Sequence, residues 1–251
     1  ASTRSPRGRF SAASSYPQLE KKLNFRNRRL YLTRTFAAAA AVVLLCLSVW
    51  TAYLYMQPAT IQTVSTLAET RTVHLPDGTS VTLNHYSSLS YPERFKSDDR
   101  EVELSGEAYF EVAKNPEKRF IVSTSHQSQI EVLGTHFNIE AYEKDDKVLA
   151  TLVEGKIGFI FTQDNVSKKV LMDPGQKLVY DSRDCKVQLY ATSGESETAW
   201  KEGKIIFRNT PLEEGLRMLE KRYNVEFIIK NDLLKGDSFT GTFTNQRLER
   251  I

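Results

Sequence analysis

Four carboxylates alternate along one short stretch of the sequence, EVELSGEAYFEV at positions 101–112. All four occupy odd positions: Glu101, Glu103, Glu107 and Glu111. Alternate residues of a β-strand share one face, and two carboxyls on one face could serve a glycoside hydrolase as acid and base. A strand face in contact with water explains such a pattern better, so we expect these side chains to be exposed.

The remaining residues that could do chemistry are four histidines and one cysteine beyond residue 57. The histidines are His74, His85, His126 and His136. Their spacing fits no metal-binding motif, and Cys185 has no recognisable histidine partner motif. Phosphate-binding loops, dinucleotide fingerprints and the G-x-S-x-G elbow are absent as well. We therefore expect no catalytic residue, no metal and no cofactor, and the chain is predicted not to be an enzyme.

The elements that carry these residues are predicted to be β-strands. Even positions of 101–112 are apolar or small, so Phe110 and Val112 are expected to be buried while Glu111 is exposed. Proline and glycine mark turns at 76–78 and 173–175, and the alternation slips at 133–134, where a bulge or bend would absorb it. No helical stripe occurs in 60–191. We predict an all-β domain there, either a sandwich or a solenoid-like stack.

A different pattern begins after the polar linker 193–197. A short apolar strand at 204–207 precedes a helix with Thr210 as its N-cap, and a second strand is predicted at Val225–Ile229. This is a β-α-β unit within 200–251. The frame F-x-N-x-x-L-E occurs at 207–213 and again at 243–249. We therefore expect a second strand-to-helix turn and a unit that continues past Ile251.

The segment 36–56, FAAAAAVVLLCLSVWTAYLYM, contains no charged residue. As a helix it would span about 30 Å, the thickness of the hydrocarbon core of a bilayer. A buried core helix would keep a polar face, and a cleaved signal peptide would have a shorter apolar run and a small-residue cleavage site. A retained transmembrane helix is therefore predicted. Nine basic residues and one acidic residue precede it, which places 1–35 in the cytoplasm. A basic segment can also bind nucleic acid, but nothing else in the sequence indicates that function.

Several ordered stretches resemble the FecR family of transmembrane sigma-factor regulators. They are LPDGTSVTLN (75–84), VELSGEAYFEVAKNPEKRFIV (102–122), IEVLGTHFNIEAY (130–142), LVEGKIGF (152–159) and DPGQKLVY (173–180). The stretch WKEGKIIFRNTPLEEGLRMLEKRYNVEF (200–227) is similar to the secretin/TonB short N-terminal-type domain of Bacteroidetes FecR proteins. The resemblance implies a single-pass inner-membrane protein with its carboxyl end in the periplasm.

The same resemblance implies two partners: the periplasmic signalling domain of a TonB-dependent receptor, and an extracytoplasmic-function sigma factor. The family usually carries a longer cytoplasmic helical region than the 35 residues present here. An alternative is a membrane-tethered periplasmic assembly module that binds no sigma factor. Small β-α-β units leave unpaired sheet edges, so we expect part of the receptor-docking surface at two such edges. The residues expected there are Lys204, Ile206, Arg208, Glu226 and Ile228.

Overall fold

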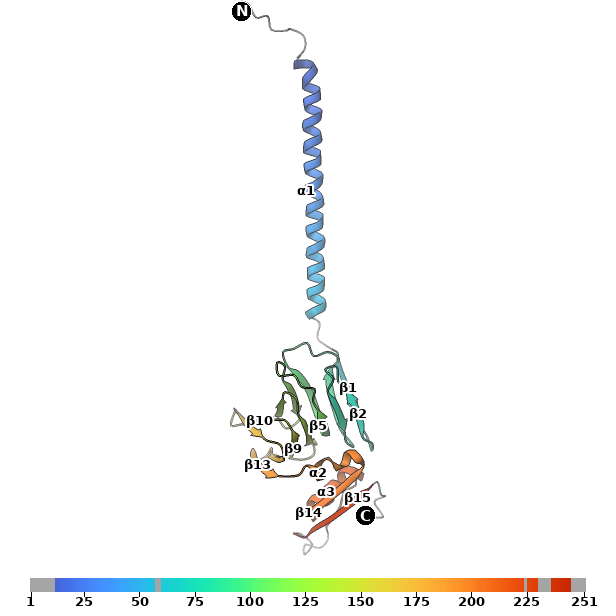
Figure 1. Ribbon diagram of the computed structural model, residues 1–251, viewed down its shortest axis with the longest axis vertical. Coiled ribbons are helices and arrows are strands. Elements are labelled where there is room, and N and C mark those ends of the chain that lie inside the picture. Colours follow the sequence, from blue (N-terminus) through green and yellow to red (C-terminus); the bar gives the residue numbers. More distant parts are fainter. Residues whose placement is uncertain (1–11, 57–59, 224, 230–235, 245–251) are drawn as a thin grey trace, which may run out of the picture. The chain divides into compact units, whose positions relative to one another are not determined.

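The computed structural model describes residues 12–56, 60–223, 225–229 and 236–244. The chain divides into two units, Ala1–Pro58 and Ala59–Ile251 (Figure 1). The first unit contains helix α1 (Ala12–Met56). Within it, Phe36–Leu54 is long and apolar enough to cross a membrane, and none of this window is buried. The segment predicted to span the membrane is therefore helical.

The second unit is built on one curled sheet of thirteen strands, which has two halves that share strand β5 (Arg100–Glu111). One half has the order β11-β10-β7-β6-β5-β4-β1, and the other has the order β2-β3-β5-β8-β9-β12-β13. The first half contains β1 (Ile61–Ser65), β4 (Ser88–Pro92), β6 (Phe120–Thr124), β7 (Ser128–Val132), β10 (Ile157–Gln163) and β11 (Val166–Met172). The second half contains β2 (Arg71–His74), β3 (Ser80–Leu83), β8 (His136–Ala141), β9 (Lys147–Glu154), β12 (Gln176–Asp181) and β13 (Lys186–Ala191).

Strand β5 passes from one half to the other at Gly106. Residues up to Ser105 pair with β4, whereas Gly106 begins the pairing with β8. Gly106 has φ 102°, and a Cβ atom there would lie 2.4 Å from the Oγ atom of Ser87. Only glycine fits this backbone conformation and this close approach. The bend lets one strand contribute to both halves of the sheet.

The two halves pack face to face around a common apolar core. Phe159 of β10 and Tyr180 of β12 belong to different halves, and their ring centroids lie 5.5 Å apart. Apart from the parallel pair β5–β6, the paired strands that the structure describes are antiparallel. The arrangement is therefore sandwich-like, which settles the choice between a sandwich and a solenoid-like stack. The mainly β fold class predicted from the sequence is confirmed.

Local predictions from the sequence also hold in this domain. Phe110 and Val112 are buried and Glu111 is exposed, as the alternation predicts. Both predicted turns join consecutive strands, β2 to β3 and β11 to β12. The slip at 133–134 is the point at which the chain crosses between the halves, because β7 belongs to the first half and β8 to the second.

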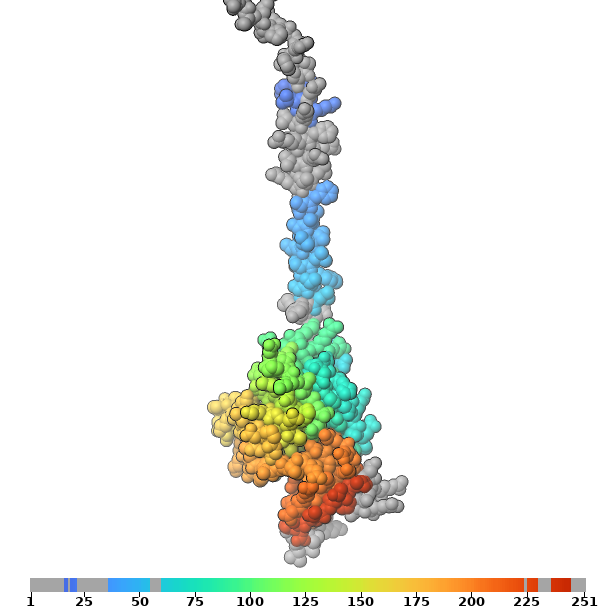
Figure 2. Space-filling model, viewed as in Figure 1, coloured from blue at the N-terminus to red at the C-terminus, as the bar shows by residue number. Residues whose placement is uncertain are grey.

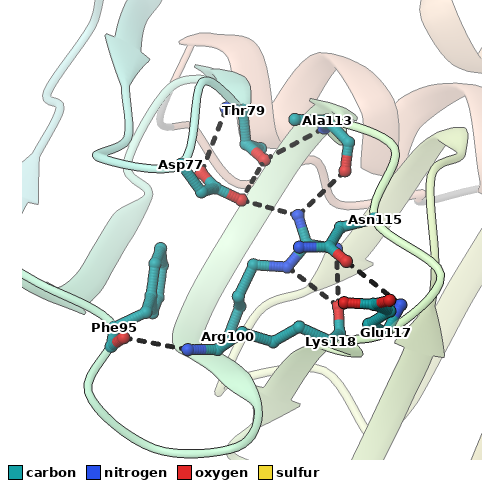
Figure 3. Close-up of polar contacts among 8 residues, drawn as sticks. All are labelled: Asp77, Thr79, Phe95, Arg100, Ala113, Asn115, Glu117 and Lys118. Carbon is teal, nitrogen blue, oxygen red and sulfur yellow. Dashed lines mark hydrogen bonds and ion pairs between the residues drawn. The ribbon is translucent and has the colours of Figure 1, made fainter.

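A buried arginine joins three segments of the β domain (Figure 3). Arg100 is only 2% exposed, and its guanidinium donates at 2.7 Å to Asp77 Oδ2 in the turn between β2 and β3. The same group donates to the carbonyl oxygen of Ala113 at 2.8 Å and to that of Lys118 at 2.9 and 3.1 Å. Asp77 in turn accepts from the backbone and hydroxyl of Thr79. Each guanidinium nitrogen of Arg100 and each carboxyl oxygen of Asp77 therefore has a hydrogen-bond partner within the protein.

The carboxyl-terminal unit follows β13 through two short helices, α2 (Glu195–Thr198) and the 3₁₀ helix η1 (Ala199–Glu202). Strand β14 (Lys204–Pro211) then leads into helix α3 (Leu212–Tyr223). Ile205, Phe207 and Leu219 form a small core of their own. The predicted N-cap, Thr210, lies at the end of β14, where its hydroxyl accepts from the backbone N–H of Arg208.

The strand predicted at Val225–Ile229 is wrong, because these residues form no strand. The backbone N–H groups of Val225 and Phe227 donate to Glu220 of α3, at 3.3 Å to its carbonyl and 2.7 Å to its carboxylate. Strand β14 pairs antiparallel with β15 (Ser238–Thr244) instead. The small α+β unit is confirmed with this different second strand. Most of the second F-x-N-x-x-L-E frame lies at 245–249, outside the described residues.

Candidate functional site

A cavity of about 400 Å³ lies where the carboxyl-terminal unit meets the β domain. Figure 2 shows the carboxyl-terminal residues, in orange and red, directly against the yellow and green residues of the β domain. The β domain contributes polar side chains to the wall: Asn84, His85, Glu107, Asn138 and Glu140. The carboxyl-terminal unit contributes Trp200, Ile206, Arg208, Arg217 and Lys221, among others. We call this region of contact, in which polar and apolar side chains from both sides line the cavity, the joint.

Glu107 lies at the centre of a hydrogen-bonded network in this joint. It is 8% exposed, and its two carboxyl oxygens accept from the side-chain amides of Asn84 at 2.6 Å and Asn138 at 2.8 Å. Burial, and then the nearby charge of Glu140, raise the pKa of Glu107 to about 7, although the two amide hydrogen bonds act in the opposite direction. The carboxyl can therefore exchange a proton near neutral pH.

Both amides are themselves held in place. The Oδ1 atom of Asn138 accepts from the indole N–H of Trp200 at 3.3 Å, and that of Asn84 accepts from the backbone N–H of His85 at 2.8 Å. Since each amide uses its oxygen in this way, its N–H₂ group is directed at Glu107. Trp200 is 9% exposed. Two hydrogen bonds through Asn138 therefore link this tryptophan of the carboxyl-terminal unit to the buried carboxyl of Glu107.

Ion pairs hold the two units together beside this network. Lys221 of α3 pairs with Glu140 at the end of β8 and with Asp145 at 2.5 Å. Burial acts to raise the pKa of Glu140, but the positive charges of Lys221 and Arg217 bring it below its ordinary value. Lys177 of β12 adds ion pairs with Glu197 and Glu214 at 3.3 and 3.6 Å. The joint therefore combines partly buried ion pairs with a buried, proton-binding carboxyl.

The geometry provides no set of groups for covalent chemistry at this joint. Glu107 contacts amides rather than a nucleophile, and Cys185 lies in the turn after β12, with Thr162 and Ser182 carbonyls as its neighbours. Within the described ranges, no group of three or more His, Cys, Asp or Glu residues could hold a metal ion. The arrangement can bind a proton and hold the carboxyl-terminal unit against the β domain.

Comparison with known proteins assigns both units to one family. The family model described as FecR protein matches residues 62–158, and that described as FecR, C-terminal, matches residues 204–251. A candidate anti-sigma factor from Parabacteroides distasonis has 30% sequence identity to the chain and a TM-score of 0.67, over 75% of this chain and 87% of that one. The chain belongs to the FecR family. A second crystal structure described in the same words matches with the same identity and TM-score, over 76% and 88%.

No curated protein sequence matches this FecR chain. Among the described residues, one apolar helix is long enough to span a membrane, and together with the FecR assignment it fits a single-pass membrane protein. The cavity at the joint is lined from both sides by residues of the two matched regions: Glu107 and Asn138 lie in the first, and Ile206, Arg217 and Lys221 in the second.

The residues predicted to dock a partner fall into two groups. Lys204, Ile206 and Arg208 share one face of β14 and line the cavity at the joint. Glu226 and Ile228 lie in the segment that forms no strand; both are exposed, Ile228 by 77%. They are not among the residues that line the cavity. The structure thus brings the first three together and leaves the other two on a separate, irregular surface.

Glu107 is the residue that the sequence prediction placed wrongly. Glu101, Glu103 and Glu111 are exposed as expected, but Glu107 is buried beneath the carboxyl-terminal unit. The alternation along β5 correctly places Glu107 on the same face as the other three glutamates. Around Glu107, however, that face is covered by a segment that lies about one hundred residues later in the chain. Of the four histidines, only His85 lines the cavity. Asn84 and Asn138 carried no signal in the sequence that would pair them with Glu107.

Proposed function

We propose that the chain is an inner-membrane regulator that relays a signal from a TonB-dependent outer-membrane receptor to an extracytoplasmic-function sigma factor. The observation that supports it most directly is the similarity, over 87% of its length, to a protein described as a candidate anti-sigma factor. A relay of this kind needs one part on each side of the membrane. The apolar segment Phe36–Leu54 can connect two such parts.

The proposed orientation places 1–35 in the cytoplasm and 57–251 in the periplasm. Nine of the 35 residues before Phe36 are basic and one is acidic, and positively charged flanks stay on the cytoplasmic side. A reporter enzyme that is active only after export, fused behind Ile251, should therefore be active. An inactive reporter on an intact fusion protein, together with activity of the same reporter fused before Ala1, would reverse this orientation.

The receptor's signalling domain is proposed to dock on the carboxyl-terminal unit at the two surfaces predicted from the sequence. The β14 surface carries the half-buried Ile206 between Lys204 and Arg208, which form exposed ion pairs with Glu202 and Glu195 that a partner's acidic groups can replace. The second surface offers Ile228, a large apolar side chain that is 77% exposed. Exposed apolar side chains next to charged ones are typical of transient protein interfaces.

One experiment tests both the role and the docking surfaces. Cells carry a sigma-dependent reporter, the full chain, and the receptor's signalling domain exported to the periplasm. With the parent chain, reporter output should change when the signalling domain is present. The variant Ile228→Glu and the double variant Lys204→Glu with Arg208→Glu should weaken binding of the purified signalling domain by at least about tenfold, as loss of a central contact does.

The matched control is Val166→Glu on edge strand β11, a side chain that is 58% exposed in the β domain and should not affect binding. If both test variants bind like the parent, the docking surfaces are placed wrongly, although the role can still hold. If the reporter output is the same with and without the chain, the role itself fails. A membrane-tethered assembly module that binds no sigma factor would then be the better description.

A further inference from the structure

The joint contains a buried acid that the proposed relay does not use. Both oxygens of Glu107 are held by neutral amides, and among the described residues no cation forms an ion pair with it. The charge of Lys221 acts to lower the pKa of Glu107, but Lys221 already pairs with Glu140 and Asp145. A carboxylate buried beside another acid, with no cation of its own, favours its neutral form for as long as it stays buried.

The other charged groups around Glu107 come from every element that packs against it. They are His85 after β3, Glu140 of β8, Tyr142 and Asp145 after β8, Lys177 of β12, Glu197 of α2, Lys204 and Arg208 of β14, and Glu214, Arg217, Lys221 and Arg222 of α3. Burial, and then the charge of Arg222, lower the pKa of His85, while burial raises that of Tyr142 far above the neutral range. Glu107 is therefore the member of this group whose pKa is shifted to neutral pH, whereas the pKa of His85 is shifted towards acid.

A short chain of hydrogen bonds connects this charge to the docking of the carboxyl-terminal unit. Asn138 donates to Glu107 and accepts from the indole of Trp200. Trp200 belongs to η1, which leads directly into β14 through Gly203. Hydration of an ionised Glu107 requires water in the cavity that Trp200 and the carboxyl-terminal unit cover. Hydration of the carboxylate and docking of Trp200 therefore oppose each other.

We propose that the joint is a proton-responsive latch, in which loss of the Glu107 proton to water loosens the docking of Trp200 and the carboxyl-terminal unit on the β domain. The sign follows from linkage. Because burial raises the pKa of Glu107 to about 7, the docked state is favoured most at pH values below the ordinary glutamate range, and this contribution is lost as pH rises through 7. One pKa unit is a factor of ten, so the docking equilibrium can change by up to about two orders of magnitude.

The inference concerns the joint itself and holds whether or not the chain acts on a sigma factor. It makes the protein responsive to a second signal, which is the pH on the side of the membrane where the unit Ala59–Ile251 lies. A partner that binds only the docked or only the loosened form would then bind in a pH-dependent way.

Trp200 itself is the reporter in the experiment that tests the latch. The chain has two tryptophans, and Trp50→Phe leaves Trp200 as the only one. With this full-length chain in detergent micelles, emission wavelength and acrylamide quenching are followed from about pH 5 to about pH 8.5, a range that brackets the Glu107 transition. We expect the emission to shift to the red and quenching to increase, with a midpoint close to pH 7.

Two substitutions in the same background separate Glu107 from the other titrating groups. Glu107→Gln, which cannot ionise, should abolish the transition, whereas Glu111→Gln, on the exposed end of the same strand, should leave it unchanged. A transition that persists in the Glu107→Gln protein would assign it to another group, such as His85, and overturn the proposal.

Glutamine at 107 directs an N–H₂ group at one of the two amide donors, so a test that needs no substitution there is also required. Carbon-13 NMR of the glutamate carboxyl groups in the parent chain should show one of them titrating with the Trp200 midpoint. Titration of all of them in the ordinary acidic range would overturn the proposal. A carboxyl that titrates near pH 7 while Trp200 fluorescence stays constant would overturn it as well, because burial would then be uncoupled from docking.

Discussion

Replacing Phe110 with alanine is expected to lower the free energy of unfolding by about 3–5 kcal/mol, the range for removal of a large side chain from a packed core. Phe110 is completely buried and lies in the part of β5 that pairs with β8. Its ring stacks on Phe137 of β8 with centroids 5.0 Å apart, and it meets the edge of Phe120 at 6.2 Å. Alanine would leave a void between the two halves of the sheet that the surrounding strands cannot close.

Urea denaturation of the full chain in detergent, followed by the circular dichroism of the β domain, measures this loss. Val166→Ala provides a control on edge strand β11, where a side chain that is 58% exposed should contribute within about 0.5 kcal/mol. A loss below about 1 kcal/mol for Phe110→Ala would be too small for a core cavity. It would mean that β5 is shifted by one residue, with Glu111 facing the core instead.

The β domain could be predicted to this level because each of its signals is local. Alternation along 101–112 depends on neighbouring residues only, and the two turns depend on proline and glycine preferences within three residues. Even the crossing between the halves of the sheet has a local signal, the change of phase at Leu133-Gly134. Its consequence, that β7 and β8 belong to different halves, comes from pairing with β6 and β5 and has no local signal.

The candidate site could not be predicted in the same way. Glu107 lies beside Trp200 and α3, which come from a distant part of the sequence and bind Asn138 and Glu140 of the neighbouring strand β8. Contacts with other parts of the chain also explain why no strand forms at Val225–Ile229. Its apolar residues fit a strand, but the Glu220 side chain binds the backbone of Phe227, while β15 takes the pairing edge of β14. In both cases the outcome depends on contacts with residues outside the segment that carries the local pattern.

Arg100 is a different case, because its position in the alternation already indicates burial. It shares even parity with Val102 and Leu104, both of which face the core. A charged residue at such a position requires partners, and the structure supplies them from the turn at Asp77 and the loop 113–118. The sequence could point to a buried arginine here, but the three acceptors that satisfy it become evident only in the fold.

The second large effect is expected for Arg100→Met, which should lower the free energy of unfolding by about 3–5 kcal/mol, as the loss of one partner from a buried ion pair does. Methionine keeps much of the side-chain volume, so the cavity cost is small. The loss comes from Asp77, 12% exposed in its side chain, and from the carbonyls of Ala113 and Lys118, which lose their donor. A buried charge without its partner is more costly than the same charge in water.

The same urea titration checks this result, with Arg119→Met as the matched control. Arg119 also pairs with an aspartate at 2.7 Å, but its side chain is 50% exposed, so water replaces the lost pair and the unfolding midpoint should hardly change. Equal unfolding midpoints for Arg100→Met and the parent would mean that water hydrates Asp77 and the two carbonyl groups in the variant. The turn between β2 and β3 would then be held by its backbone hydrogen bonds and the contacts of Thr79, without a contribution from Arg100. A large loss for Arg100→Met together with none for Arg119→Met would show that burial, and not the presence of an ion pair, determines the contribution to stability.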